Sequence, residues 1–70
     1  MNIISKVDGI LNSVPDEGQV IDKGEVLYQV EIMKSIYDIL AQERVEVDMV
    51  LIREGALLHK GDVVMTVESI

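Results

Sequence analysis

Lys34 is the residue of this chain whose type and position are best suited to carry chemistry. Its side chain ends in a primary amine on a long flexible stem, a group that can be acylated to form a neutral amide. The residue lies between Met33 and Ser35, in the stretch Val30-Glu31-Ile32-Met33-Lys34-Ser35. What distinguishes it from an ordinary solvated lysine is its place within a repeat.

The 15 residues from Glu17 to Glu31 are repeated from Glu54 to Glu68 at a constant offset of 37 positions. Seven of the 15 aligned pairs are identical, and no gap is needed. Random matching rarely gives such agreement, so we infer an internal duplication and a fold with approximate two-fold symmetry. The first copy runs directly into Lys34, which makes this lysine the asymmetric feature of a symmetric frame. We therefore expect function there.

Other kinds of reactive site have little support in the sequence. The chain contains no cysteine, and hence no disulfide, no thiolate zinc site and no thiol nucleophile. His59 is the single histidine, which argues against a Ser-His-Asp triad and against a multi-histidine metal site. We expect His59 to be a solvated loop residue, and we predict no catalytic residue and no metal site.

The charge and hydropathy of the chain exclude two classes of partner. Its formal net charge of -7 would repel nucleic acid, and no basic stripe with interleaved aromatic residues is present. An anionic membrane surface is an equally poor partner. The longest apolar stretch, Met49-Val50-Leu51-Ile52, has the length of a strand, and the N-terminus does not resemble a signal peptide. We expect a cytoplasmic protein that binds neither nucleic acid nor membrane.

Short apolar stretches alternate with turn residues along the whole chain. This pattern predicts many short strands joined by tight turns, and no helices. In the strand at 26–32, alternation places Val26, Tyr28, Val30 and Ile32 on one face. The glycines at 18, 24, 55 and 61 are interpreted as turn residues with positive φ. The predicted strands are residues 3–7, 10–14, 20–21, 26–32, 36–40, 45–52, 57–58 and 63–67.

These strands favour an all-β fold of two duplicated halves. The expected architecture is a flattened antiparallel β-barrel, or a sandwich of two four-stranded sheets, with residues 1–70 forming a single domain. A two-residue turn at Met33-Lys34 would require positive φ at residues other than glycine. Such strain would indicate that the tip is kept for a reason other than stability.

The stretch around Lys34 resembles the attachment sequence of biotinyl domains, whose usual form is Glu-Ala-Met-Lys-Met. The resemblance covers nearly the whole chain, because residues 17–25 and 53–63 are similar to the family's Glu-Gly-Asp-x-Val-x-x-Gly-Asp stretch. Asp8-Gly9 resembles its first turn, which precedes a strand. The chain departs from the family at Ser35, where methionine is usual, and at residues 41–45, which lack the Pro and Gly of the second turn.

The resemblance, closest to the biotin carboxyl carrier domains of acyl-CoA carboxylases, implies that biotin is attached covalently to Lys34 on an exposed hairpin. Met33 and Ser35 would then belong to the surface that a biotin protein ligase recognises. Biotin would carry a carboxyl group from a biotin carboxylase to a carboxyltransferase, with acetyl-CoA or another acyl-CoA as the expected acceptor. The domain itself would not be catalytic.

Two alternatives remain open. A lipoyl-bearing carrier domain is similar, but lipoyl domains usually carry Asp-Lys-Ala at the tip, and Met33 distinguishes this chain from them. The other alternative is an unmodified lipoyl-like module with a structural or interaction role, because Ser35 and the missing turn residues are features expected of a degenerate site.

Overall fold

The computed structural model describes all 70 residues, which form eight strands and no helix. Every predicted strand is present, and β3, β4 and β7 have the predicted bounds. The main differences are that β1 and β6 end earlier than expected and that β8 ends later, at Ser69. The strands are β1 (Asn2–Ile4), β2 (Gly9–Ser13), β3 (Val20–Ile21), β4 (Val26–Ile32), β5 (Ser35–Leu40), β6 (Val45–Val50), β7 (Leu57–Leu58) and β8 (Val63–Ser69).

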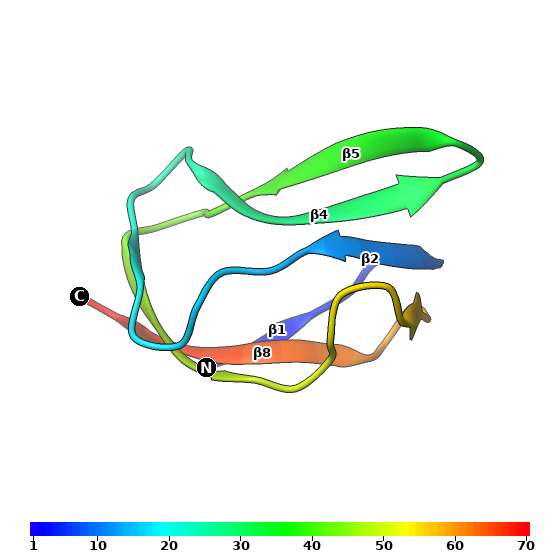
Figure 1. Cartoon of the computed structure of the whole chain (residues 1–70). Coiled ribbons are helices and arrows are strands. Elements are labelled where there is room, and N and C mark those ends of the chain that lie inside the picture. Colours follow the sequence, from blue (N-terminus) through cyan, green and yellow to red (C-terminus); the bar gives the residue numbers. More distant parts are fainter.

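Two four-stranded antiparallel sheets face each other, with the strand orders β1-β8-β6-β3 and β5-β4-β2-β7 (Figure 1). The two orders become identical when β1 is exchanged with β5, β8 with β4, β6 with β2 and β3 with β7. Each sheet therefore contains strands from both halves of the chain. The all-β fold and the two-fold symmetry inferred from the repeat are confirmed.

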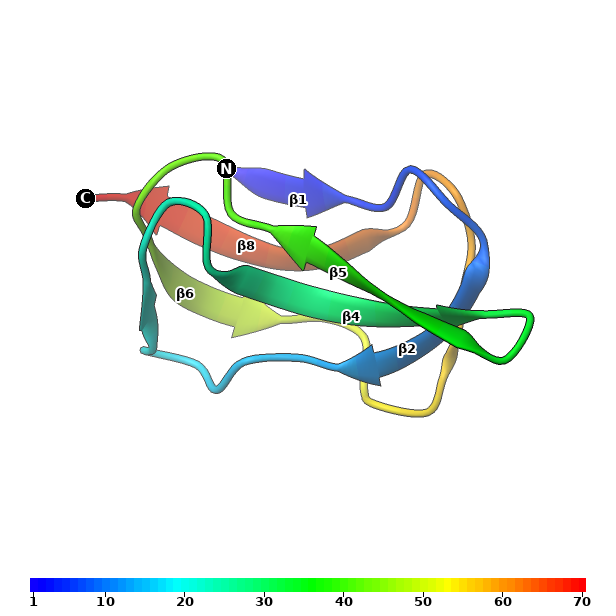
Figure 2. The same cartoon turned by 90° about the horizontal axis from the view of Figure 1, so that it is seen from above.

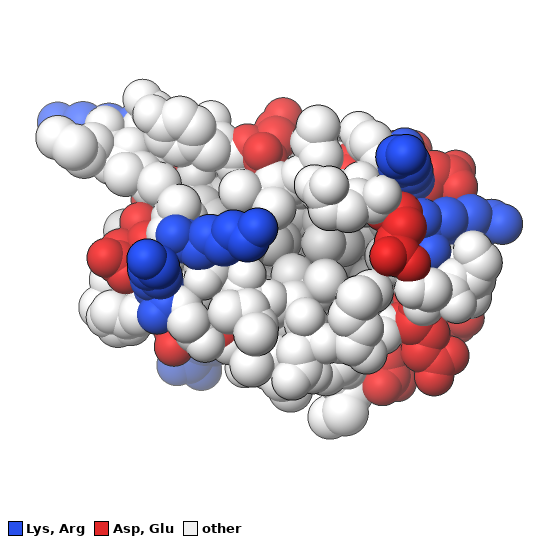
Figure 3. Space-filling model, turned by 180° about the vertical axis from the view of Figure 1, so that it is seen from behind, with Lys and Arg blue, Asp and Glu red and all other residues white.

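The two sheets do not close into a barrel, so the fold is a flattened sandwich with open edges. A groove lies between the edge strands β1 and β5, and the core residues Leu27 and Tyr28 line its floor. The side of the molecule opposite to that of Figure 1 is largely uncharged, with a basic side chain lying across it toward the centre and the other charges nearer its edges (Figure 3).

Bulges repeat along with the strands. The pairing of β4 shifts between Val26 and Tyr28, and β8 has the equivalent shift around Val64. One detail of the predicted alternation is therefore wrong. Val26 is exposed, whereas the neighbours Leu27 and Tyr28 are both buried, because a bulge lets two consecutive residues face the core.

The four turn glycines, Gly18, Gly24, Gly55 and Gly61, have φ between 85° and 97°, which confirms their predicted role. Backbone hydrogen bonds run from these turns to residues of the other half of the chain. The amide of Gly18, for example, donates to the carbonyl of Val47 at 2.7 Å. The turns therefore tie the two halves together.

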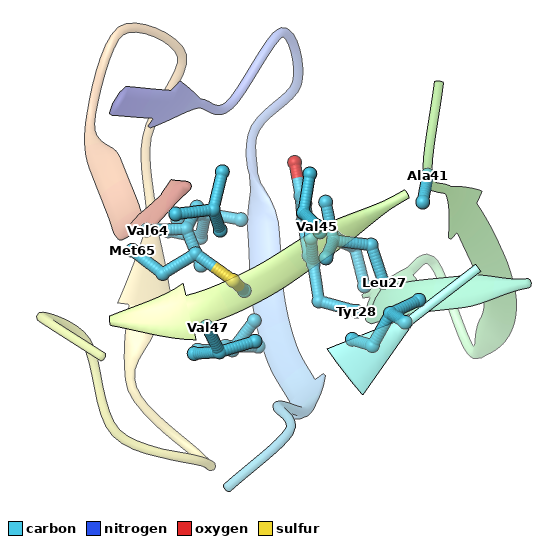
Figure 4. Packing of buried hydrophobic residues seen from close by; sticks show 12 residues of the cluster. Leu27, Tyr28, Ala41, Val45, Val47, Val64 and Met65 are labelled. Atoms are coloured by element: carbon cyan, nitrogen blue, oxygen red, sulfur yellow. The ribbon is translucent and has the colours of Figure 1, made fainter. Parts of the chain in front are cut away.

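Twelve buried apolar residues fill the space between the sheets (Figure 4). Tyr28 is the only ionisable side chain among them. Burial raises the pKa of its phenol above the ordinary value, and a hydrogen bond with Ser5 partly opposes this effect. The twelve are Leu11, Ile21, Leu27, Tyr28, Val30, Ala41, Val45, Val47, Leu58, Val64, Met65 and Val67.

The hairpin formed by β4 and β5 breaks the symmetry. β5 has six residues, whereas its counterpart β1 has three. The hairpin projects from one end of a molecule whose longest dimension is 34 Å, while both chain termini lie toward the opposite end (Figures 1 and 2). The asymmetry seen in the sequence is thus an asymmetry of shape.

Met33 and Lys34 form the two-residue turn at the hairpin tip, with φ values of 50° and 69°. Ile32 and Ser35 pair with each other and close the turn. The predicted positive φ at residues other than glycine is confirmed. A left-handed conformation costs a residue with a side chain about 1–2 kcal/mol, and turns of this length favour Asn-Gly.

Gly9 lies in β2, directly beside the end of β4 that leads into the hairpin turn. It begins β2 and has no positive φ, so the interpretation of Asp8-Gly9 as a turn is wrong. A Cβ at this position would lie 2.6 Å from the carbonyl oxygen of Glu31 and 2.6 Å from Cγ1 of Val30. The glycine is required because β4 approaches its backbone closely.

Replacing Met33 by Asn together with Lys34 by Gly should stabilise the protein, because both new residues tolerate the left-handed conformation. We expect the free energy of unfolding to rise by about 1 kcal/mol, after allowing for the greater freedom of glycine in the unfolded chain. Denaturant unfolding of the two proteins measures the difference. A decrease would show that a tip side chain makes a contact worth more than the strain.

Gly9→Ala should lower the free energy of unfolding by about 1–3 kcal/mol, because the added methyl group overlaps the backbone of β4. Thermal and denaturant unfolding measure the loss. Unchanged stability would mean that β4 can move away from β2 at no cost, and would argue against a rigid support for the tip.

Candidate functional site

The structure brings Met33, Lys34 and Ser35 together at the tip of the hairpin. Met33 and Lys34 form the turn, and Ser35 is the first residue of β5. All three are exposed, and Met33 retains 93% of its accessible surface. The predicted position of the lysine, on an exposed hairpin, is confirmed.

The amine of Lys34 has no ionic partner. The two ion pairs of the structure join Arg44 to Asp22 and His59 to Asp62, and neither involves the tip. An unpaired primary amine on a flexible stem, held away from the sheets, is open to an enzyme that approaches from outside. The arrangement can therefore present an amine for acylation, and the amide product would need no further group from this chain.

The base of the hairpin is held firmly. β4 pairs with β5 from Val26–Leu40 up to Ile32–Ser35, and on its other side it pairs with β2. Val30, three residues before the turn, is fully buried in the core. The last residues before the turn are therefore held by strands on both sides of β4.

The remaining residues considered in the sequence lie away from the tip. His59 is exposed in the turn before β8, with Nδ1 3.6 Å from Oδ2 of Asp62, which agrees with a solvated loop residue. No group of three or more His, Asp or Glu side chains is arranged to hold a metal ion. The structure also contains no helix that could cross a membrane.

Three exposed apolar residues near the tip could not be identified from the sequence. Ile36 lies in β5, Ile10 in β2 and Leu57 in β7, and only the pairing of the strands brings them into one row. Isolated exposed apolar residues are common, so none of the three gives a signal by itself. A correct prediction of strand register would have been needed to find them.

Comparison with known proteins identifies a family and a shared fold. Residues 1–67 match the biotin/lipoyl family, described as biotin-requiring enzyme. No curated protein matches the chain by sequence. Among solved structures, a single-chain, multi-domain long-chain acyl-CoA carboxylase matches all of this chain, with a TM-score of 0.95 and 21% identity. The chain spans 7% of the length of that protein, and at this identity the match shows a shared fold.

The family match extends over nearly the whole chain and includes both halves of the repeat as well as the hairpin between them. A duplicated sandwich with a lysine at the tip of its one projecting hairpin is the form expected from the sequence resemblance. With the match covering residues 1–67, the chain belongs to the biotin/lipoyl domain family of biotin-requiring enzymes.

Proposed function

We propose that this chain is a biotin carboxyl carrier domain, with biotin joined through an amide to Nζ of Lys34. The observation that carries the proposal is the position of this lysine. It is exposed and unpaired, and it lies in a turn whose backbone is strained for a residue with a side chain. Met33 supports biotin over lipoate, because lipoyl domains usually have aspartate before the lysine.

The residues at the tip fit a covalently attached cofactor. The ammonium group of Lys34 first gives up a proton, and the free amine attacks an activated carboxyl group. The amide bond forms as the activating group leaves with the electron pair of its bond to the carbonyl carbon, and the nitrogen releases a second proton to solvent. Lys34 loses its positive charge in this step, so the formal net charge becomes one unit more negative than -7. Bound biotin supplies the position that accepts and releases a carboxyl group.

The role of the protein is to position and deliver the cofactor. The paired strands below the turn fix the point of attachment, while the lysine stem provides the freedom to move. Tethering raises the effective concentration of the cofactor at separate active sites. We propose a biotin protein ligase, a biotin carboxylase and a carboxyltransferase as partners. Residues 1–70 would act as one non-catalytic carrier domain.

An acyl-CoA is the proposed acceptor of the carboxyl group, with acetyl-CoA as the first to test. The sequence around Lys34 resembles carriers of acyl-CoA carboxylases, and a protein of that name shares the fold. Both observations support this class of acceptor.

Co-expression with a biotin protein ligase and biotin should add one biotinyl group to the chain, measured as intact mass. Lys34→Arg should abolish the gain and change the free energy of unfolding by less than about 0.5 kcal/mol, because an exposed tip contributes little packing. Lys23→Arg, at an exposed turn lysine elsewhere in the repeat, is the matched control and should be labelled normally.

Other results of this experiment would decide between the remaining functions. A folded chain that gains no biotin but is labelled by a lipoyl ligase would be a lipoyl carrier. A folded chain labelled by neither enzyme would be an unmodified module, as Ser35 in place of the usual methionine allows. Loss of folding in Lys34→Arg would show that the lysine is structural.

Met33→Asp should lower kcat/KM for biotinylation about tenfold, the effect of losing about 1.4 kcal/mol of recognition. The variant places an acidic residue where the ligase is proposed to contact a methionine. Initial labelling rates over a range of protein concentrations give the value. Ser35→Met, which restores the usual family residue, should be labelled at least as fast as the unaltered chain. An unchanged rate in Met33→Asp would remove Met33 from the recognition surface.

A further inference from the structure

A row of side chains crosses the sheet that carries the hairpin, close to the tip. Strand pairing aligns Ile36 of β5 with Glu31 of β4, Glu31 with Ile10 of β2, and Ile10 with Leu57 of β7. Residues directly opposite each other in a sheet point to the same face. These four residues are called the tip row below.

The tip row faces outward. In β4, β2 and β7 its members are next to Val30, Leu11 and Leu58, which are at most 1% exposed and face the core. Neighbouring residues of a strand point to opposite faces, so the tip row points away from the core. Its three apolar members are between 39% and 69% exposed, and Val20, the counterpart of Leu57 in the other sheet, is exposed and apolar as well.

The other half of the molecule shows what the fold requires at these positions. In the equivalent row of the second sheet, Glu68 of β8 pairs with Glu46 of β6, and Glu46 pairs with Val20 of β3. Glu31 and Glu68 occupy equivalent places, but Ile10 stands where the second sheet has Glu46. The same frame thus carries an acidic residue at one end and an apolar residue at the end near Lys34.

The tip row is next to the proposed attachment site. The pair Ile36–Glu31 directly follows Ile32–Ser35, the pair that closes the turn. Ile36 is two residues from Lys34, a separation of at most about 7 Å, the length of two residues in an extended strand. A protein surface that covers the turn therefore meets Ile36 first. Ile10 and Leu57 lie two and three strands farther across the sheet, about 10 and 14 Å from Ile36, which is within the width of a typical protein interface.

We infer that the tip row is a docking surface for the enzyme that acylates Lys34, an inference that rests on the proposed function. The enzyme is expected to present an apolar strip with a cation opposite Glu31, the one charged member of the row. The net charge of -7 on this chain would favour such a basic partner. Ile10 and Leu57 are directly paired, and Glu31 separates them from Ile36. Adjacent exposed apolar side chains beside polar residues are typical of interaction sites.

The ligase is the partner favoured by distance. During acylation the reacting atom is Nζ itself, so the hairpin must enter the active site and the sheet below it must come close to the enzyme. Once a cofactor is attached, the reacting atom lies farther from the sheet by the length of that group. A later partner can therefore act without touching the tip row.

The test compares biotinylation rates of Ile10→Glu and Leu57→Glu with that of the unaltered chain, using a biotin protein ligase and biotin. Both variants should lose about tenfold or more in kcat/KM, mainly through KM, because a charge enters the apolar contact. Val20→Glu is the matched control, since Val20 is the counterpart of Leu57 in the other sheet. It should be labelled within about twofold of the unaltered chain.

A second measurement separates docking from folding. Lys34→Arg cannot be acylated but retains the tip row, so an excess of it should inhibit labelling of the unaltered chain competitively. Adding Leu57→Glu to Lys34→Arg should weaken this inhibition about tenfold. Thermal unfolding of each variant shows whether the fold is retained.

The outcomes distinguish this inference from the proposed function. Normal labelling of Ile10→Glu and Leu57→Glu, with the unaltered chain labelled, would overturn the docking surface alone. An equal loss in Val20→Glu would overturn it too, as a general effect of charge. Normal labelling followed by poor carboxylation of the attached biotin would assign the row to a later partner and overturn the role of the ligase. No labelling of the unaltered chain would overturn both proposals.

Discussion

The amide of Gly18 donates to the carbonyl of Val47 at 2.7 Å, and the amide of Gly55 donates to the carbonyl of Leu11 at 2.8 Å. Each bond joins a turn of one half to a strand of the other. Because each sheet also takes strands from both halves, neither half can complete a sheet or cover its apolar face alone. The core, the bulges and the position of the hairpin all depend on this sharing of strands between the halves. A chain of this size buries only a small core, so other contributions to its stability are limited.

The symmetric frame makes the strained tip possible. A two-residue turn without glycine or asparagine is unfavourable in isolation, with a cost of about 1–2 kcal/mol at each residue. Here β4 is paired on both sides, Val30 is buried below the turn, and Gly9 lets β2 approach closely. These interactions hold Lys34 at a defined point. They involve Val30 and Gly9, whose replacement by a residue of different size would disturb the packing. Strain at a site that such a scaffold over-determines is typical of a functional position.

The parts of this structure that follow local rules could be predicted from the sequence. Glycine turns and short apolar stretches located all eight strands, and the repeat singled out Lys34. Features that depend on packing could not be predicted. The bulge that buries Leu27 alters a regular alternation, and Gly9 looked like a turn residue because nothing local shows how close β4 lies. The tip row could not be predicted for a similar reason. Ile10 and Leu57 are far apart in sequence, and only the pairing of β2 with β7 makes them neighbours.

One further consequence follows from the placement of the chain ends. Both termini lie toward one end of the molecule and the lysine lies at the other, along a longest dimension of 34 Å. In a larger polypeptide that contains this domain, a flexible connection at the termini would act as a pivot and the rigid sandwich as a lever arm. The swing of the whole body would then add to the reach of the lysine stem. For any group attached to this lysine, the length of the strands would then contribute to the distance covered, together with the lysine side chain.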